Sequence, residues 1–220
     1  MRNIYISNIT AWAPGLGADS TLWNEWANEN ASIELTNESP KLEYTDPLFR
    51  RRLSQITKMT VHVIHGVLEQ SHISKETKIV FMSLRGEITR TLNVTKGLVQ
   101  DNMILPAGFS LSVFNTPVSS ATLAFALKGG YSVIYPSESN FSEAFKAAVA
   151  PVLAGTEKDL ILAYADELVP EAYGDKRPAE NIPLAYAFVV SSEKKDNCIC
   201  LEDFSNIEKS PVDFLKFLLK

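Results

Sequence analysis

Two histidines and one acidic pair are spaced in ways that could support chemistry. His62 and His65 are three residues apart, so on a helix they would share one face and could bind a metal ion. No third ligand accompanies them at a suitable spacing, so we predict no metal and no other cofactor. Asp166 and Glu167 follow an apolar run, where active sites of α/β proteins often lie, but no partner base accompanies them.

The hydroxyl and glycine motifs are incomplete as well. Ser119 and Ser120 lack the Gly-x-Ser-x-Gly surroundings of a nucleophile elbow. Gly15-Leu-Gly17 lacks the third glycine and the following helix of a dinucleotide site. These motifs therefore predict neither a serine hydrolase nor a dinucleotide-binding enzyme.

The composition is that of one globular domain. The 220 residues are 45% hydrophobic and 21% charged, which provides a sizeable core without disulfides or metals. With a net charge of -5, the chain lacks the basic balance of nucleic-acid binders, so we expect no nucleic-acid partner. The N-terminus is polar, and the sequence contains no run of about 18 apolar residues. We therefore expect that the chain is not secreted and does not span a membrane.

The two cysteines favour a reducing compartment, so we expect a cytoplasmic protein. Cys198 and Cys200 are too close in an extended segment for an easy mutual disulfide. The simplest interpretation is two buried apolar side chains on one face of a strand, and an exposed redox pair is the alternative.

Strand and helix patterns alternate along the chain, which predicts an α/β fold. Runs of strand type occur at 2–9, 78–82, 131–135, 159–165, 184–190 and 198–201. Helical patterns occur at 23–26, 53–68, 119–127 and 141–153, with a short helix beginning at Ser210-Pro211. The polar stretches 24–45 and 171–181 are typical of surface loops.

Two asparagines are predicted to cap helices. Asn115 precedes Thr116-Pro117, and proline is favoured at the first helical position. Asn140, with Glu143 three residues later, resembles a capping box. Gly66 interrupts the apolar face of the 53–68 helix, which is tolerable if another segment packs closely there.

Four ordered segments resemble the N-terminal half of a β-ketoacyl synthase. They are Pro47-Leu-Phe-Arg-Arg-Arg-Leu-Ser-Gln, Ser112-Val-Phe-Asn-Thr-Pro, Gly130-Tyr-Ser-Val-Ile-Tyr-Pro and Leu162-Ala-Tyr-Ala-Asp-Glu. Each is weak alone, but the ordered series is specific and extends from about residue 1 to about 192. More narrowly, the chain is similar to the short chain length factors of bacterial aryl polyene gene clusters.

The resemblance implies a thiolase-like α/β fold, here one half of the duplicated ketosynthase fold with a mixed five-stranded sheet and helices. Residues 1–192 would form this half, and residues 193–220 would add a strand and a helix packed on the same domain. Burying the many apolar residues of that extension would stabilise it against the domain.

The resemblance also places the nucleophile position of an active ketosynthase on Glu138, which is not a cysteine. A carboxylate would have to form an anhydride to carry an acyl chain, so thioester transfer onto it is implausible. No histidine follows Glu138, whereas the family's catalytic histidines lie downstream. We therefore expect no catalytic residue and no condensing activity from this chain alone.

The resemblance implies a heterodimer with an active β-ketoacyl synthase. The strand before Glu138 would pair across the dimer seam, with Tyr131, Val133 and Tyr135 alternating along it. The acyl tunnel would pass the segment between Pro106 and Asn115, and this chain would contribute part of its wall through Ala107, Gly108, Phe109, Ser110, Phe114 and Glu138. An acyl carrier protein would deliver malonyl or aryl-acyl groups.

Two features keep alternatives open. Arg50, Arg51 and Arg52 could steer an acidic carrier protein, although such a run is more often a solvated face or an ion pair. Glu138 could be a structural carboxylate at a helix start, or it could make the chain a stand-alone acyl-thioester decarboxylase or transferase. A third alternative is a scaffold that stabilises its partner without touching substrate.

Overall fold

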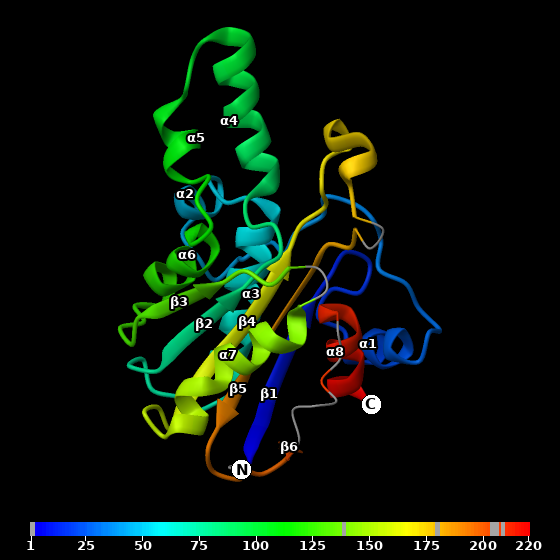
Figure 1. The fold of residues 1–220 in the computed structure, drawn as a ribbon, viewed down its shortest axis with the longest axis vertical. Coiled ribbons are helices and arrows are strands. Elements are labelled where there is room, and N and C mark those ends of the chain that lie inside the picture. Colours follow the sequence, from blue (N-terminus) through cyan, green and yellow to red (C-terminus); the bar gives the residue numbers. More distant parts are fainter. Residues whose placement is uncertain (1–2, 138–139, 179–180, 203–206, 208–209) are drawn as a thin grey trace.

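A mixed β-sheet forms the centre of the molecule (Figure 1). The computed structural model describes residues 3–137, 140–178, 181–202, 207 and 210–220. In this part the sheet has six strands in the order β3-β2-β4-β5-β1-β6. β2, β3 and β4 are parallel, and β5, β1 and β6 each run antiparallel to the strand before them in that order. The bounds are β1 Ile4–Trp12, β2 Lys78–Met82, β3 Tyr131–Ile134, β4 Asp159–Asp166, β5 Leu184–Ser191 and β6 Ile199–Leu201.

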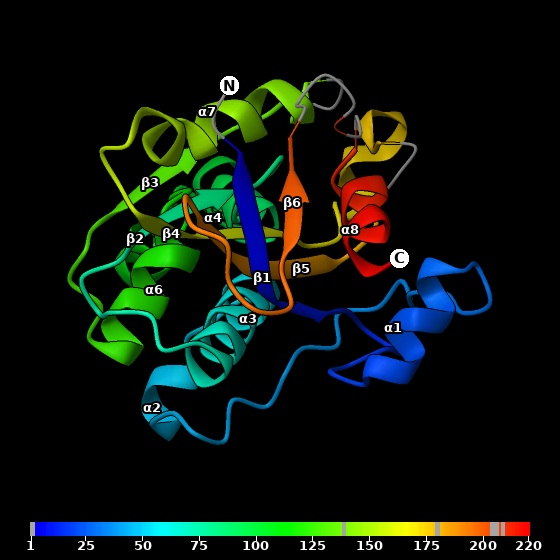
Figure 2. The ribbon, with the colours of Figure 1, turned by 90° about the horizontal axis from the view of Figure 1, so that it is seen from below.

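Helices flank the sheet on both faces (Figure 2). Their bounds are α1 Ser20–Ala27, α2 Pro47–Arg50, α3 Gln55–Gln70, α4 Ile88–Asp101, α5 Pro106–Ser110, α6 Thr116–Phe125, α7 Phe141–Ala154 and α8 Pro211–Leu219. A 3-10 helix, η1, spans Glu171–Lys176. The α/β prediction is confirmed, and the sixth strand, β6, comes from the segment after residue 192. None of the described helices is both long and apolar enough to span a membrane.

One face of the sheet is covered by α3 and α6. The apolar positions of α3 recur at three and four residues, and Ile56, Val63 and Ile64 of its buried stripe are fully buried against β2, β4 and β5. The Ser54 side chain accepts a hydrogen bond from the backbone of Thr57 and thereby begins the helix. A Cβ at Gly66 would meet Thr10 of β1 at 2.5 Å, so the close packing that the sequence required is present.

The opposite face is covered by α7, α1 and α8. Alternate residues of β4 point to the two faces, so that Leu162 packs under α7 while Ile161 packs under α3. Phe214 of α8 is fully buried, and its ring centroid lies 5.6 Å from that of Phe141 and 4.8 Å from that of Phe145. The C-terminal helix therefore belongs to the main core of the molecule.

Several sequence predictions were wrong in detail. Neither Asn115 nor Asn140 makes a side-chain capping hydrogen bond, and the Asn115 amide instead donates to the Tyr131 hydroxyl at 2.9 Å. β1 continues to Trp12 because an irregularity at Asn8, whose φ is 54°, shifts the register with β5 instead of ending the strand. Cys200 is exposed on the edge strand β6, so its predicted burial is wrong.

Candidate functional site

The parallel strands β2, β3 and β4 end at the same edge of the sheet, and polar side chains are buried beside two of these ends. Ser83 and Glu87 follow β2, while Asp166 ends β4 and Glu167 comes next. All four side chains belong to residues that are at least nine-tenths buried. Buried carboxylates require hydrogen-bond donors, so their partners define how this edge is built.

Asp166 fixes the loop after β2. Its carboxylate accepts hydrogen bonds from the Ser83 hydroxyl at 2.7 Å, the Tyr164 hydroxyl at 2.5 Å and the Arg85 backbone at 3.1 Å. The Arg85 guanidinium lies 3.4 Å away and the Leu84 N–H 3.2 Å away. Burial raises the pKa of Asp166, and the bonds from Tyr164, Arg85 and Ser83 act in the opposite direction.

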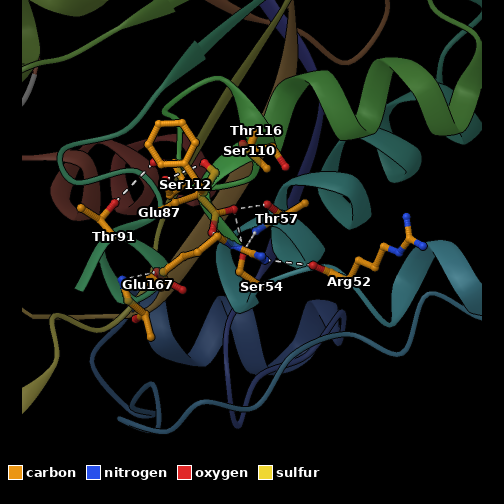
Figure 3. A network of polar contacts seen from close by, with 12 residues as sticks. Arg52, Ser54, Thr57, Glu87, Thr91, Ser110, Ser112, Thr116 and Glu167 are labelled. Atoms are coloured by element: carbon orange, nitrogen blue, oxygen red, sulfur yellow. Dashed lines mark hydrogen bonds and ion pairs between the residues drawn. The ribbon is translucent and has the colours of Figure 1, made fainter. Parts of the chain in front are cut away.

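Glu87 joins the starts of α3 and α4 (Figure 3). Its Oε1 accepts hydrogen bonds from the hydroxyls of Ser54 at 2.7 Å and Thr57 at 2.5 Å. Its Oε2 pairs with Nε of Arg90 at 3.1 Å, and Arg90 also donates to the backbone carbonyl of Arg52 at 2.9 Å. The first turn of α4 is thus held by charge-assisted bonds and not by apolar burial.

Glu167 connects β4 to the same two helix starts. Its carboxylate accepts a hydrogen bond from the backbone N–H of Thr89 in α4 at 3.0 Å, and the backbone N–H of Ile56 in α3 also stabilises its charged form. Burial nevertheless raises the pKa of Glu167 to about 7, and the nearby Glu87 adds to the rise. Sequence reasoning singled out Asp166 and Glu167 but missed Glu87, whose one signal was an acidic residue shortly after a predicted strand.

Two clefts lie beside this network. The smaller has a volume of about 370 Å³ and is lined by Asn37, Ser39, Ser54, Gln55, Lys58, Thr89, Arg90, Asn93 and Glu167. The larger has a volume of about 800 Å³ and is lined by Leu35, Asn37, Thr89, Leu168, Val169, Pro170, Glu171, Gly174, Asp175, Arg177, Pro178 and Asn181. Both linings include Asn37 and Thr89, so the two clefts adjoin each other beside the first turn of α4, and together they are called the trough below.

Beyond the network, α4 and α5 form an arm that stands away from the sheet (Figure 1). Neither helix contains a buried residue. The arm exposes large apolar side chains at Leu98, Val99, Met103, Ile104, Leu105 and Phe109. A helical arm with this surface is typical of a protein interface, since monomers rarely expose extended apolar patches.

The predicted seam strand, β3, is the strand at one edge of the sheet. Ile79 donates to the Gly130 carbonyl and Ser83 donates to the Ile134 carbonyl, so even-numbered residues of β3 face β2. The backbone groups of Tyr131 and Val133 therefore point away from the sheet. Tyr131 is 37% exposed, and Tyr135, directly after the strand, is 48% exposed.

The structure distributes the predicted tunnel residues over the arm and its base. Ala107, Gly108, Phe109 and Ser110 lie in α5, where only Gly108 is half-buried. Phe114 lies at the base, and its ring centroid is 3.4 Å from that of Tyr135. A Cβ at Gly86 would meet the Phe114 ring at 2.8 Å, so this glycine allows Phe114 to seat there. Glu138 lies outside the described residues.

The histidine pair has a structural explanation. The Tyr44 ring stacks on His65 with centroids 3.7 Å apart, and the Tyr44 hydroxyl lies 3.3 Å from Nδ1 of His62. Burial lowers the pKa of both histidines. No group of three or more potential metal ligands occurs in the part of the chain that the structure describes.

The arginine run is divided between structural and exposed roles. The Arg50 guanidinium donates to the carbonyls of Leu42 and Thr45 and therefore holds a loop. The side chains of Arg51 and Arg52 belong to exposed residues.

Comparisons with known proteins identify the family. The sequence model of the family "Beta-ketoacyl synthase, N-terminal domain" matches residues 23–213. A comparison with curated proteins found no matching sequence.

Solved structures share the fold. One is "Ketosynthase (ApeO) in Complex with its Chain Length Factor (ApeC) from Xenorhabdus doucetiae", with a TM-score of 0.80 and 22% identity over 100% of this chain and 92% of that chain. Another is "The ishigamide ketosynthase/chain length factor", with a TM-score of 0.66 and 11% identity over 87% of this chain and 62% of that chain.

A third solved structure, "AntDE:AntF (apo): type II PKS acyl-carrier protein in complex with its ketosynthase bound to the hexaketide", has a TM-score of 0.67 and 13% identity over 87% of this chain and 63% of that chain. The chain thus covers less than two thirds of the latter two proteins. The predicted thiolase-like ketosynthase half-fold is confirmed. On these findings the chain belongs to the β-ketoacyl synthase N-terminal domain family.

Proposed function

We propose that the chain is a non-catalytic chain length factor, which pairs with an active β-ketoacyl synthase and shapes the acyl tunnel in aryl polyene biosynthesis. The observation that carries this proposal is the free edge of β3 beside an arm that has no buried residue of its own. A free strand edge is a template for pairing with another chain. The exposed apolar side chains of the arm would be covered in the same interface.

The partner would contribute the catalytic groups that the resemblance assigns to active ketosynthases. This chain would contribute α5 and Phe114 to the tunnel wall, and an acyl carrier protein would deliver malonyl or aryl-acyl groups. Two of the similar structures are described as ketosynthases with a chain length factor, and the third as a ketosynthase with an acyl carrier protein. We also retain the expectation of a cytoplasmic complex.

Strand pairing is tested by Val133→Pro. Proline removes the Val133 N–H, which points away from β2, so the sheet should persist while pairing with the partner is lost. The matched control is Val133→Ala, which removes most of the side chain but keeps the N–H. We expect the wild type and Val133→Ala to co-elute with a ketosynthase that has intact cysteine and histidines, and Val133→Pro to elute separately. Co-elution of Val133→Pro would contradict pairing through β3.

The tunnel role is tested by Gly108→Trp in the reconstituted pair. A Cβ at Gly108 would lie 3.8 Å from the Val94 side chain, an ordinary contact, so Gly108→Ala serves as the conservative control. Mass spectrometry of the products should show shorter chains for Gly108→Trp and unchanged chains for Gly108→Ala. If both variants give products of unchanged chain length, Gly108 does not limit the length of the chain.

Activity of the chain by itself separates this proposal from a stand-alone enzyme. Purified chain should leave a malonyl thioester unchanged. Consumption of the thioester that is abolished by Glu138→Ala would replace the proposal with a decarboxylase.

A further inference from the structure

The trough at the first turn of α4 has a cationic end. Lys58, on α3, is half-buried, and its ammonium Nζ lies 3.4 Å from the Ser39 hydroxyl. Among the described residues no carboxylate lies within ion-pair distance of this ammonium. A partly desolvated cation without a counter-charge attracts an anion more strongly than an exposed lysine does.

Arg90 adds hydrogen-bond donors to the same end. Its Nε pairs with Glu87 and its Nη2 donates to the Arg52 carbonyl, which holds the guanidinium in one orientation. The five N–H groups of a guanidinium exceed these two bonds, and the side chain, 19% exposed, lines the smaller cleft. The remaining donors are therefore available to a ligand in that cleft.

The other end of the trough combines apolar and charged side chains. Its apolar lining comes from two segments, Leu35 before α2 and Leu168, Val169, Pro170 and Pro178 around η1, and the same end is also lined by Glu171, Asp175 and Arg177. The Asn181 side chain holds the start of this segment by bonds to both the N–H and the carbonyl of Val169. The cleft that contains Lys58 and Arg90 therefore adjoins a lining segment whose start is held in place.

We propose that this trough binds a small organic anion, a carboxylate with a short apolar body. The carboxylate would bond to Lys58 and Arg90, and the body would lie along Leu168, Val169 and Pro170. The site is separate from β3 and from α5, so it goes beyond the proposed function and does not depend on it.

Binding should be coupled to the protonation of Glu167, which lines the smaller cleft. The charged groups around it are Lys58 from α3, Glu87 and Arg90 from α4, and Glu171, Asp175 and Arg177 from the segment after β4. Burial already raises the pKa of Glu167 to about 7, and a bound anion would disfavour its charged form further. Binding would then take up a proton, so the affinity should fall as the pH rises from about 6 to about 8.

The test is isothermal titration of the full chain with octanoate, at about pH 6 and about pH 8, where octanoate itself stays ionised. Acetate supplies the head group without the body, and octanol supplies the body without the head group. Octanoate should bind more tightly than either probe. Lys58→Gln should weaken octanoate binding about tenfold, the effect of one lost charge-assisted bond. Lys158→Gln, before the opposite end of β4 and paired with Glu193, is the matched control and should bind normally.

Glu167→Gln tests whether the titration of Glu167 causes the pH dependence of octanoate binding, which a purely structural role of Glu167 would not produce. Glutamine keeps an acceptor for the Thr89 N–H but cannot titrate, so this variant should bind octanoate equally well at both pH values. Octanol binding as tightly as octanoate, an unaltered Lys58→Gln, or no heat from octanoate at either pH would each overturn the proposal. Co-elution of the Lys58 and Glu167 variants with a ketosynthase reports on the proposed function separately.

Discussion

Asp166 is the residue on which the loop after β2 depends, because five donor groups converge on its carboxylate. Asp166→Asn removes the charge and replaces one acceptor by a donor, so donors would face each other in a buried site. We expect a loss of about 3 kcal/mol in the free energy of unfolding, as for a broken buried ion pair. Urea denaturation measures this value.

Asp159, at the opposite end of β4, provides the control. It pairs with Lys195 at 2.8 Å in a partly exposed position. Asp159→Asn should therefore cost less than about 1 kcal/mol. Equal losses in the two variants would mean that Asp166 contributes no more than a surface ion pair.

Glu167 makes the stability depend on pH. Its pKa is raised from 4.5 to about 7 in the folded chain, so its contribution is fully present below about pH 4.5 and is lost as the pH rises through 7. Glu167→Gln removes this dependence. Between pH 5 and pH 8 the free energy of unfolding of the variant should rise by about 3 kcal/mol relative to that of the wild type. Parallel stability curves for the two proteins over this range would contradict the assignment.

The sequence could indicate some residue roles and not others. Asp166 and Glu167 were recognisable because they end an apolar run. Glu87 was not, because Thr57 and Ser54, to which it bonds, lie 30 and 33 residues away in the chain. Asn115 occupies the expected position before α6, but its side chain makes no capping bond there and its amide N–H donates to the Tyr131 hydroxyl, 16 residues away.

At the scale of elements, α8 buries Pro211, Phe214, Leu215 and Leu218, and Phe214 is the largest of these side chains. Phe214 is fully buried among the rings of Phe141, Phe145 and Phe188, whereas Phe217, also on α8, is 46% exposed. Phe214→Ala should lower the free energy of unfolding by about 3 to 5 kcal/mol. Phe217→Ala should cost clearly less. Thermal unfolding distinguishes the two, and similar shifts would show that α8 is not anchored by Phe214.

The arm should be the least stable helical region of the isolated chain. α4 has no buried residue, whereas α3 buries eight residues along one face. Backbone hydrogen bonds that lack packed side chains open locally at low free-energy cost. Hydrogen exchange should therefore be faster in α4 than in α3, and a partner should slow it. Equal protection of α3 and α4 against hydrogen exchange in the isolated chain would contradict the prediction that a partner covers and stabilises the arm.

The same difference explains which elements the sequence could predict. α3 and the strands β2 and β4 bury continuous or periodic apolar residues, and their patterns identified them. α4 carries three threonines and Gly97, all poor helix formers, and packs no face on the core. Its helix is stabilised at the start by polar contacts with distant segments, which no local pattern encodes.

At the scale of the whole molecule, the arm carries a group of exposed apolar side chains: Leu98, Val99, Met103, Ile104, Leu105 and Phe109. The isolated chain should therefore associate with itself as its concentration rises, and sedimentation velocity would detect this. Replacing Leu105 and Phe109 by serine should reduce the association. Phe217→Ser, at a similarly exposed apolar residue on α8, should not. A chain that stays monomeric at high concentration would contradict the prediction that the apolar surface of the arm is an interface.

The position of β1 within the sheet has a consequence for biosynthesis. β1 precedes the other described strands in the chain, and in the part that the structure describes it pairs with β5 and β6. Its hydrogen-bonding edges therefore remain unsatisfied until β5 has been translated. During this interval β2, β3 and β4, which neighbour one another, can assemble with their helices, so β1 enters a sheet that is already partly assembled.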